Sequence, residues 1–377
     1  MSGVNTFYHL IAYRFLEINF GADFTPIISK NRDMMHEALF YSKLDDQEIN
    51  CHLCPADCQI EPEGAGDCRV RINRHGVLFS EAYGRLEAMN LDPIEKKPLY
   101  HFYPGEKILS VGTAGCNLHC SFCQNHPLSQ CGVTDDGKDR HFFAPEDLVE
   151  LAKQTAHNIG VAFTYNEPTV NYEFMLSTAV NARAVGLHTA MISNGYINSE
   201  PLNSLLGPIE AFNIDLKAFS SKFYRTYCKG KLDPVLKTIK QIAASSCHLE
   251  LTSLIIPGLN DDLAEFEQLC RWIADETGRS TVLHLSRYFP GYRLKLDPTP
   301  ADTLFRMYDL AKNFLHHVYL GNLFAGDHGD TFCPHCNAKL IERDRYRILP
   351  VGLDARGACK RCKTAVIKHY LHEYDHS

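Results

Sequence analysis

The chain has 377 residues, 45% of them hydrophobic, which is enough for one large α/β domain with small attached modules. Its formal net charge of −7 gives no whole-chain basis for binding nucleic acid or an anionic membrane. No apolar run approaches the roughly 20 residues of a membrane span, and residues 1–24 lack the layout of a secretion signal, so we expect a cytoplasmic protein without a membrane partner.

Fifteen cysteines are the main compositional feature. In a chain that is expected to be cytosolic they favour metal binding over disulfides. Eleven of them fall into three clusters, which strengthens that interpretation. The other four are isolated and are expected to be small buried hydrophobic residues: Cys131, Cys228, Cys247 and Cys270.

The chain begins with two segments that we expect to precede the main domain. Residues 1–34 are expected to be an extension outside the fold, either a disordered arm or the product of an upstream start codon. Residues 35–104 are expected to form a cysteine-rich module and a linker. Four cysteines within eighteen residues are a metal-binding density, and their spacing leaves zinc and an auxiliary iron–sulfur cluster both open. They are Cys51, Cys54, Cys58 and Cys68.

The linker from Asp92 to Phe102 is unusually rich in reactive and aromatic side chains. We hypothesise that Lys97, Tyr100 or His101 lines the substrate side of the following domain.

Residues 105–325 alternate short β-rich runs with amphipathic helical patterns. A helix is expected to begin at Pro145 and to end before Gly160, and another to run from about Tyr172 to Gly186. Six β-then-α units without hairpin signals predict an α/β fold: a partial (β/α)6 TIM-type barrel with parallel strands, open on one side. The expected strands are Ile108–Val111, Val161–Tyr165, His188–Ile192, Ala211–Leu216, Leu249–Ile256 and Val282–Leu285.

The loop after the first of these strands contains Cys116, Cys120 and Cys123, spaced C-x3-C-x2-C. Three thiolates can hold three corners of a 4Fe–4S cubane, a cluster that normally takes four cysteine ligands, so one iron is left open to a ligand that is not protein. The alternative is a structural zinc knot with His119 as fourth ligand. The position of His119 between two cysteines makes that geometry poor, and a solvated turn histidine is the simpler interpretation.

Each later strand also ends in polar residues. An Asn-Glu-Pro or Asn-Gly sequence alone would be an ordinary turn. In barrels of this type, however, chemistry takes place at the carboxyl ends of the strands. Five such sequences in the same register behind a cysteine loop therefore predict a binding site.

The cysteine loop resembles the signature of radical S-adenosylmethionine enzymes. The resemblance implies that the amino and carboxylate groups of S-adenosylmethionine chelate the open iron. It also implies that an electron from the cluster breaks a carbon–sulfur bond to give methionine and a 5′-deoxyadenosyl radical, which abstracts hydrogen. Phe122 matches the aromatic residue that packs beside the adenine in this family, or it is simply a hydrophobic anchor of the loop.

Residues 107–321 resemble the branch that contains the pyruvate formate-lyase activating enzyme. Asn166 and Glu167 occupy the place of that branch's Gly-Gly-Glu turn, which implies that Glu167 accepts from the amino group of S-adenosylmethionine. Asp215 and Lys217 match its Asp-x-Lys, with Lys217 as the partner of the methionine carboxylate.

The same branch implies three further contacts. Asn194 matches a polar contact to the ribose or methionine part, and Pro257 and Gly258 match the wall beside the adenine. His284 is either an inward-pointing ligand contact or a satisfied core histidine.

Residues 326–377 are expected to form a zinc-ribbon-like module. Two C-x2-C knuckles, separated by 22 residues, predict a zinc site. Nine Lys or Arg against three Asp or Glu between positions 333 and 369 indicate either a solvated basic face or a docking patch for an acidic reductant of the flavodoxin or ferredoxin type, with Lys360, Arg361 and Lys363 at its centre. The knuckle cysteines are Cys333, Cys336, Cys359 and Cys362.

The three cysteine sets, in this order over residues 35–368, resemble the radical enzyme of the AmmeMemoRadiSam system. The resemblance implies AMMECR-type and Memo-type partner proteins, and it supplies no substrate. Two alternatives remain: an activase that abstracts hydrogen from a glycine of a partner protein, and a non-enzymatic multi-zinc binding module. The overall acidity argues against nucleic acid as a partner of such a module.

Overall fold

A computed structural model describes residues 35–133, 142–323, 326–344 and 346–371. The expected extension, residues 1–34, lies outside the described residues. Among the described helices, none is long and apolar enough to cross a bilayer.

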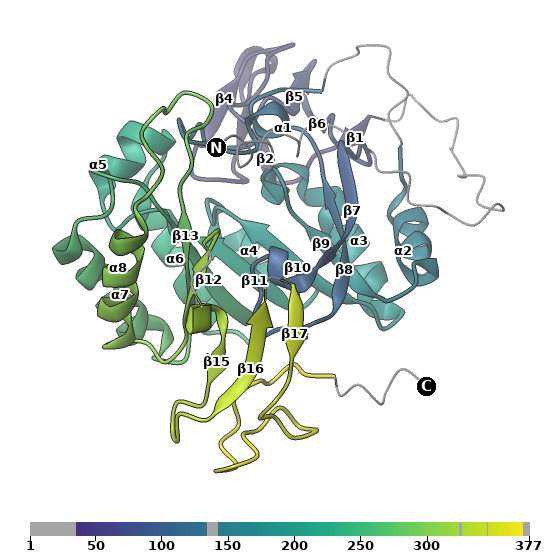
Figure 1. The fold of residues 1–377 in the computed structure, drawn as a ribbon. Coiled ribbons are helices and arrows are strands. Elements are labelled where there is room, and N and C mark those ends of the chain that lie inside the picture. Colours follow the sequence, from purple (N-terminus) through teal and green to yellow (C-terminus); the bar gives the residue numbers. More distant parts are fainter. Residues whose placement is uncertain (1–34, 134–141, 324–325, 345, 372–377) are drawn as a thin grey trace, which may run out of the picture.

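An eight-stranded sheet forms the centre of the protein (Figure 1), with neighbouring strands in the order β14-β13-β12-β11-β10-β9-β8-β7. Strands β8 to β14 are parallel, and β7 pairs antiparallel with β8. Because β7 and β14 are the two edges, the sheet curls without closing, and the expected partial barrel is confirmed. The strands are β7 (Ala88–Pro93), β8 (Lys107–Gly112), β9 (Asn158–Phe163), β10 (His188–Ser193), β11 (Ala211–Asp215), β12 (His248–Ile255), β13 (Val282–Arg287) and β14 (Val318–Gly321).

Three details differ from the sequence expectations. The sheet gains β14 and the antiparallel β7, which the linker supplies. Strand β9 begins three residues before the expected start at Val161. Gly160 does not end a helix but lies inside β9, where an added Cβ would come within 1.8 Å of the carbonyl oxygen of His188. A side chain there would therefore prevent the pairing of β9 with β10.

Helices cover the outer side of the sheet (Figure 1). Pro145 occupies the first turn of its helix as expected, and the helix that starts at Tyr172 ends one residue before Val185, with Gly186 in the left-handed conformation that favours glycine. The helices are α1 (His126–Ser129), α2 (Pro145–Gln154), α3 (Tyr172–Ala184), α4 (Ser199–Leu205), α5 (Ser221–Phe223), α6 (Leu232–Ala243), α7 (Leu263–Thr277) and α8 (Ala301–Lys312).

Two small β modules lie at opposite ends of the barrel (Figure 1). The N-terminal module lies beside the cysteine loop, since an added Cβ on Gly115 would come within 2.6 Å of the carbonyl oxygen of Cys68. It consists of β1 (His36–Glu37), β2 (Tyr41–Lys43), β3 (Ile49–Cys51), β4 (Cys58–Ile60), β5 (Arg71–Arg74) and β6 (Val77–Ser80). The C-terminal module closes the other end and consists of β15 (Thr331–Phe332), β16 (Lys339–Asp344) and β17 (Arg347–Leu349).

Candidate active site

The loop after β8 holds Cys116, Cys120 and Cys123 at the carboxyl end of the parallel strands. The Cys116 sulfur accepts from the backbone N–H of Leu118 at 3.4 Å, and the Cys123 sulfur lies 3.1 Å from the Ser129 hydroxyl. Burial raises the pKa of the Cys116 and Cys123 thiols above the ordinary value. Bound iron would reverse this effect, because a coordinated thiol is deprotonated.

The geometry does not favour the zinc alternative for this loop. The His119 ring nitrogen Nδ1 lies 3.0 Å from the Gln130 side-chain oxygen and 3.3 Å from the Arg69 guanidinium. Across the described part of the chain, these cysteines and His119 are not gathered closely enough to hold a single ion. His119 instead helps to fix the loop.

Asn166 holds the cysteine loop to the end of β9. Its side-chain oxygen accepts from the backbone N–H of Thr113 at 3.1 Å, and its amide donates to the carbonyls of Ala114 and Gly115 at 3.1 and 2.9 Å. Since Gly115 immediately precedes Cys116, the position of the first cysteine depends on this side chain. The structure thus gives Asn166 a supporting contact that the sequence analysis missed.

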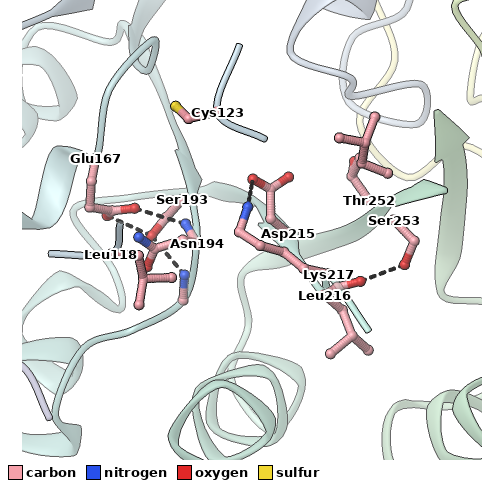
Figure 2. A network of polar contacts seen from close by, with 12 residues as sticks. Leu118, Cys123, Glu167, Ser193, Asn194, Asp215, Leu216, Lys217, Thr252 and Ser253 are labelled. Carbon is pink, nitrogen blue, oxygen red and sulfur yellow. Dashed lines mark hydrogen bonds and ion pairs between the residues drawn. The ribbon is translucent and has the colours of Figure 1, made fainter. Parts of the chain in front are cut away.

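Glu167 is 1% exposed and joins two strand ends. One carboxylate oxygen accepts from Thr169 and from the Ser193 hydroxyl at 2.8 Å, and the other accepts from the backbone N–H of Asn194 at 2.8 Å (Figure 2). Burial raises its pKa, although these donors counteract the shift. A carboxylate offers about four acceptor positions, so the second oxygen retains capacity for one further donor.

Asn194 connects this network to the first cysteine. Its amide donates to the Asn117 side-chain oxygen at 2.9 Å and lies 3.6 Å from the Cys116 sulfur. The prediction that Asn194 contacts S-adenosylmethionine stays a prediction, but the structure does bring it to the cysteine loop.

Asp215 and Lys217 form an ion pair of 2.8 Å at the end of β11. Figure 2 shows this pair facing the Glu167, Ser193 and Asn194 group across an interval, with Cys123 above. Burial disfavours the charge of Lys217, but the Asp215 carboxylate and the Cys120 thiolate hold the pKa of Lys217 well above its ordinary value. Lys217 therefore offers a fixed positive charge to an anionic group of a ligand.

The turn after β12 is tied to Lys217 by Asn260, a residue that the sequence analysis did not single out. The buried Asn260 amide donates to the Lys217 carbonyl at 2.7 Å, and its oxygen accepts from the backbone N–H of Ile256 at 2.7 Å. Pro257 and Gly258 lie between Ile256 and Asn260 in this turn, and Gly258 is exposed and at φ +72°. The signal was available, because an Asn-Asp pair after Pro-Gly favours local side-chain to backbone bonds.

Phe122 is 4% exposed and packs against Phe223, with ring centroids 5.7 Å apart. This contact is that of a hydrophobic anchor of the loop. A role beside adenine stays a prediction.

The linker contributes a buried ion pair, Lys97 with Asp92. The Lys97 ammonium donates to Asp92 at 2.6 Å, and the Tyr165 hydroxyl donates to the same carboxylate oxygen at 2.6 Å. Burial lowers the pKa of Lys97 to about 8 although Asp92 opposes the shift. Because Tyr165 directly precedes Asn166 in the chain, Lys97 is connected to the cysteine loop through Asp92, Tyr165 and the contacts of Asn166.

Tyr100 and His101 have a different environment. Their backbone N–H groups donate to Glu250 at 2.9 and 2.7 Å, and the His101 ring lies 2.6 Å from the Tyr319 hydroxyl. His284 also contacts Glu250, at 2.6 Å, which is the satisfied core histidine of the two earlier interpretations. These residues seal the barrel at the end of the C-terminal module.

The four C-terminal cysteines form a compact group. Their sulfur atoms all lie within 4.8 Å of one another, with Cys333 and Cys362 3.4 Å apart and Cys336 and Cys359 3.6 Å apart. A tetrahedral ion with metal–sulfur bonds of about 2.3 Å needs sulfurs roughly 3.8 Å apart. The group can therefore hold one metal ion.

The N-terminal cysteines line one pocket together with Arg71 and Asn117. Burial raises the pKa of Cys54 to about 12 and that of Cys58 to about 11. Asn117 belongs to the loop that carries Cys116, Cys120 and Cys123, so the two cysteine sets are neighbours in space. The pocket cysteines are Cys51, Cys54, Cys58 and Cys68.

Lys360, Arg361 and Lys363 are exposed on the C-terminal module. In Figure 1 this module lies at the opposite end of the barrel from the cysteine loop. That separation favours the solvated basic face over a patch that delivers electrons directly to the loop.

Comparisons with known proteins agree with this site. The Radical SAM superfamily profile matches residues 110–273. The uncharacterized protein MJ0808 of Methanocaldococcus jannaschii is 42% identical over 332 residues, which are 87% of this chain and 97% of that protein. The (2S)-3-sulfopropanediol dehydratase activating enzyme of Klebsiella oxytoca is 25% identical over 119 residues, 32% of this chain and 38% of that enzyme, so the match spans well under half of its length.

Among solved structures, a domain of pyruvate-formate lyase-activating enzyme from Bacteroides vulgatus matches with a TM-score of 0.40 and 20% identity, covering 43% of this chain and 99% of that domain. The profile match begins inside β8 and runs through the cysteine loop and the Asp215–Lys217 pair to α7. Residues 110–273 therefore belong to the radical SAM superfamily, and the protein is a radical SAM enzyme.

Proposed function

We propose that the protein generates a 5′-deoxyadenosyl radical from S-adenosylmethionine and uses it to abstract hydrogen from a substrate that is not yet identified. The observation that carries the proposal is the meeting of the three-cysteine loop and the Asp215–Lys217 ion pair at one end of the barrel. A cluster held by three cysteines needs a chelating ligand for its fourth iron, and the anionic end of such a ligand needs a cation.

The residues fit both groups. Cys116, Cys120 and Cys123 would hold a 4Fe–4S cluster, which when bound supplies one electron that cleaves S-adenosylmethionine into methionine and the radical. Lys217 would pair with the methionine carboxylate, since its charge is fixed by Asp215. The remaining acceptor capacity of Glu167 suits the amino group.

Further contacts and partners belong to the same proposal. Asn194 would contact the ribose or methionine part, and Phe122, Pro257 and Gly258 would border the adenine. A flavodoxin or ferredoxin-type protein would supply the electron, and AMMECR-type and Memo-type proteins would act with the enzyme. Zinc would occupy the compact C-terminal group, because thiolate donors at this spacing suit it.

The second candidate is an activase that abstracts hydrogen from a glycine of a partner enzyme. The similarity to activating enzymes, over 119 and 125 residues, supports it. A glycyl radical signal on a partner protein after incubation would favour this candidate, because the first predicts no such signal. The non-enzymatic module is not supported, since the family is one of enzymes.

The test is anaerobic incubation of the reconstituted protein with dithionite and S-adenosylmethionine, followed by measurement of 5′-deoxyadenosine. The wild type should form it, and replacement of Cys116, Cys120 and Cys123 by Ala should abolish it. Cys247→Ser is the matched control, because Cys247 lies outside the loop and donates only to the Ile209 carbonyl. Absence of 5′-deoxyadenosine from iron-loaded wild type would overturn the proposal.

A further inference from the structure

The N-terminal cysteines converge on one pocket although they come from different elements. Cys51 ends β3 and Cys58 begins β4, and the two are direct cross-strand partners. Cys54 lies in the turn between them, and Cys68 precedes β5. All four line the same pocket.

This pocket differs from the compact C-terminal group of the same chain. Within the described residues, the group whose ligand atoms are drawn together as a single ion requires is Cys333, Cys336, Cys359 and Cys362. The N-terminal sulfurs surround a space instead. A cubane cluster binds its four thiolates through four different irons, so it requires such a wider arrangement.

Arg71 supplies a second observation at the same pocket. Its side chain is 2% exposed, and its guanidinium donates to Glu173 at 2.9 Å and to the Leu39 carbonyl at 2.5 Å. Its Nε–H has no hydrogen-bond partner. An unsatisfied buried donor costs about 1–3 kcal/mol, so an acceptor inside the pocket would remove this cost.

The pocket also contacts the loop that carries Cys116, Cys120 and Cys123. Asn117 lines it, and the same Asn117 side chain accepts from Asn194, whose amide lies 3.6 Å from the Cys116 sulfur. Gly115, at φ +91°, packs against the carbonyl oxygen of Cys68. A cluster in the pocket would therefore lie directly behind the active-site loop.

We propose that Cys51, Cys54, Cys58 and Cys68 hold a second 4Fe–4S cluster, and that the Arg71 Nε–H donates a hydrogen bond to one of its sulfurs. Four protein thiolates complete the coordination of this cluster, unlike that of the cluster at Cys116, Cys120 and Cys123. The proposal concerns a separate site and does not require that S-adenosylmethionine is cleaved.

The first test counts iron and acid-labile sulfide in anaerobically reconstituted full-length protein. The wild type should contain about eight irons per chain, and the variant in which Cys116, Cys120 and Cys123 are all Ala should keep about four. The quadruple Ser variant of the N-terminal cysteines should also keep about four. Cys247→Ser should retain all eight, and circular dichroism of each variant checks that it folds.

The outcomes separate this inference from the proposed function. Four irons in the wild type and none in the Ala variant, or zinc retained at the N-terminal cysteines, would overturn the second cluster and leave the radical chemistry intact. No iron in the quadruple Ser variant, provided that it folds, would also contradict the assignment. Wild type that binds eight irons yet forms no 5′-deoxyadenosine would overturn only the proposed function.

The role of Arg71 is tested in the Ala variant of the first cluster, where only the second cluster contributes a signal. Arg71→Lys keeps a cation beside Glu173 but deletes the Nε–H. Because hydrogen bonds to cluster sulfurs tune the reduction potential, Arg71→Lys should keep four irons and lower the midpoint potential measured by titration monitored by electron paramagnetic resonance. An unchanged potential would show that Arg71 does not contact the cluster.

Discussion

At the scale of single residues, the candidate site is built from polar side chains that each hold several backbone groups. Asn166 contacts three successive residues of the cysteine loop, and Glu167 joins the ends of β9 and β10. Buried polar groups of this kind are costly unless every partner is present. The loop geometry therefore depends on them even where they touch no ligand.

Asn166→Ala should make the first cluster labile. The substitution leaves the Ala114 and Gly115 carbonyls and the Thr113 N–H without this partner, so the loop loses its fixed shape at a cost of about 1–3 kcal/mol. Iron retention after gel filtration is the measurement. Asn181→Ala, which removes an exposed contact to Glu146, is the control and should retain iron like the wild type; equal retention by both variants would contradict the prediction.

Lys217→Met should weaken S-adenosylmethionine binding without loss of iron. Removing a charge-assisted bond of about 1.5–3 kcal/mol corresponds to a roughly 10- to 100-fold weaker affinity. Isothermal titration with the loaded enzyme measures it, and Lys222→Met on the exposed side of α5 is the control. Unchanged affinity would remove Lys217 from the binding site.

At the scale of elements, the strands carry different functions at their two ends. The carboxyl ends of β8 to β12 bring the candidate site together, while the starts of β12 and β13 bind the linker through Glu250. The C-terminal module completes this seal, because Arg343 donates to the Tyr100 carbonyl at 2.9 Å and its guanidinium lies over the Tyr100 ring. The linker is therefore a part of the barrel. Its Asp92 contacts Tyr165 near the cysteine loop, and its Tyr100 and His101 contact Glu250 near the C-terminal module.

Arg343→Met should loosen the C-terminal module from the barrel. The variant loses the bonds to Tyr100 and Thr331, and the expected decrease in the free energy of unfolding is about 2–3 kcal/mol. Urea denaturation followed by tyrosine fluorescence measures it. Lys153→Met, which breaks an exposed pair with Glu150, should cost under about 0.5 kcal/mol, and similar costs for both variants would show that the contacts of Arg343 contribute little.

At the scale of the whole molecule, the two cysteine sets of the proposed clusters share one end and the compact metal group lies at the other (Figure 1). With both proposed clusters in place, electrons would reach the candidate site from the N-terminal end. The basic side chains of the C-terminal module are remote from it.

Replacing Lys360, Arg361 and Lys363 together with Gln should leave reduction of the cluster unchanged, whether flavodoxin or dithionite is the donor. The three residues are exposed and lie on the far module. Stopped-flow absorbance measures both rates. Slower reduction by flavodoxin with an unchanged dithionite rate would instead establish docking at this patch.

The buried histidine His317, near the C-terminal module, predicts that the free energy of unfolding falls at acid pH. Burial lowers the pKa of His317 to about 3, with Lys312 and His316 acting in the same direction. The unfolded chain has the ordinary value near 6.5, so below that pH it binds the proton more readily, and stability falls as the pH falls toward 3. His317 should account for about 2 kcal/mol of the loss between pH 6.5 and 4.5.

His317→Gln should flatten that dependence, because glutamine does not titrate. The comparison of unfolding free energies at the two pH values, wild type against variant, cancels the acid lability of bound iron. His75→Gln, at an exposed position, should keep the wild-type slope. A variant at position 317 with that same slope would contradict the assignment.

Elements whose signals are local could be predicted from the sequence. Repeated β-then-α patterns predicted six parallel strands within a few residues, and cysteine spacing together with the polar strand ends marked Cys116, Glu167 and Lys217 as one group. These inferences hold because periodicity and metal spacing depend on near neighbours along the chain. The antiparallel strand β7 was not recognised, since its pairing with β8 is a tertiary preference that a linker rich in charged and aromatic residues conceals.

Which residues become neighbours in space is visible only in the folded chain. The contacts of Asn166 with the cysteine loop and of Asp92 with Tyr165 join residues more than 50 positions apart, and Arg71 meets Glu173 across 102 positions. No local pattern encodes such contacts, because they arise when the curled sheet brings separate loops to one end. Likewise, the spacing of the cysteines did not separate a single-ion site from a cluster site; the distances between folded sulfurs did so for the C-terminal group.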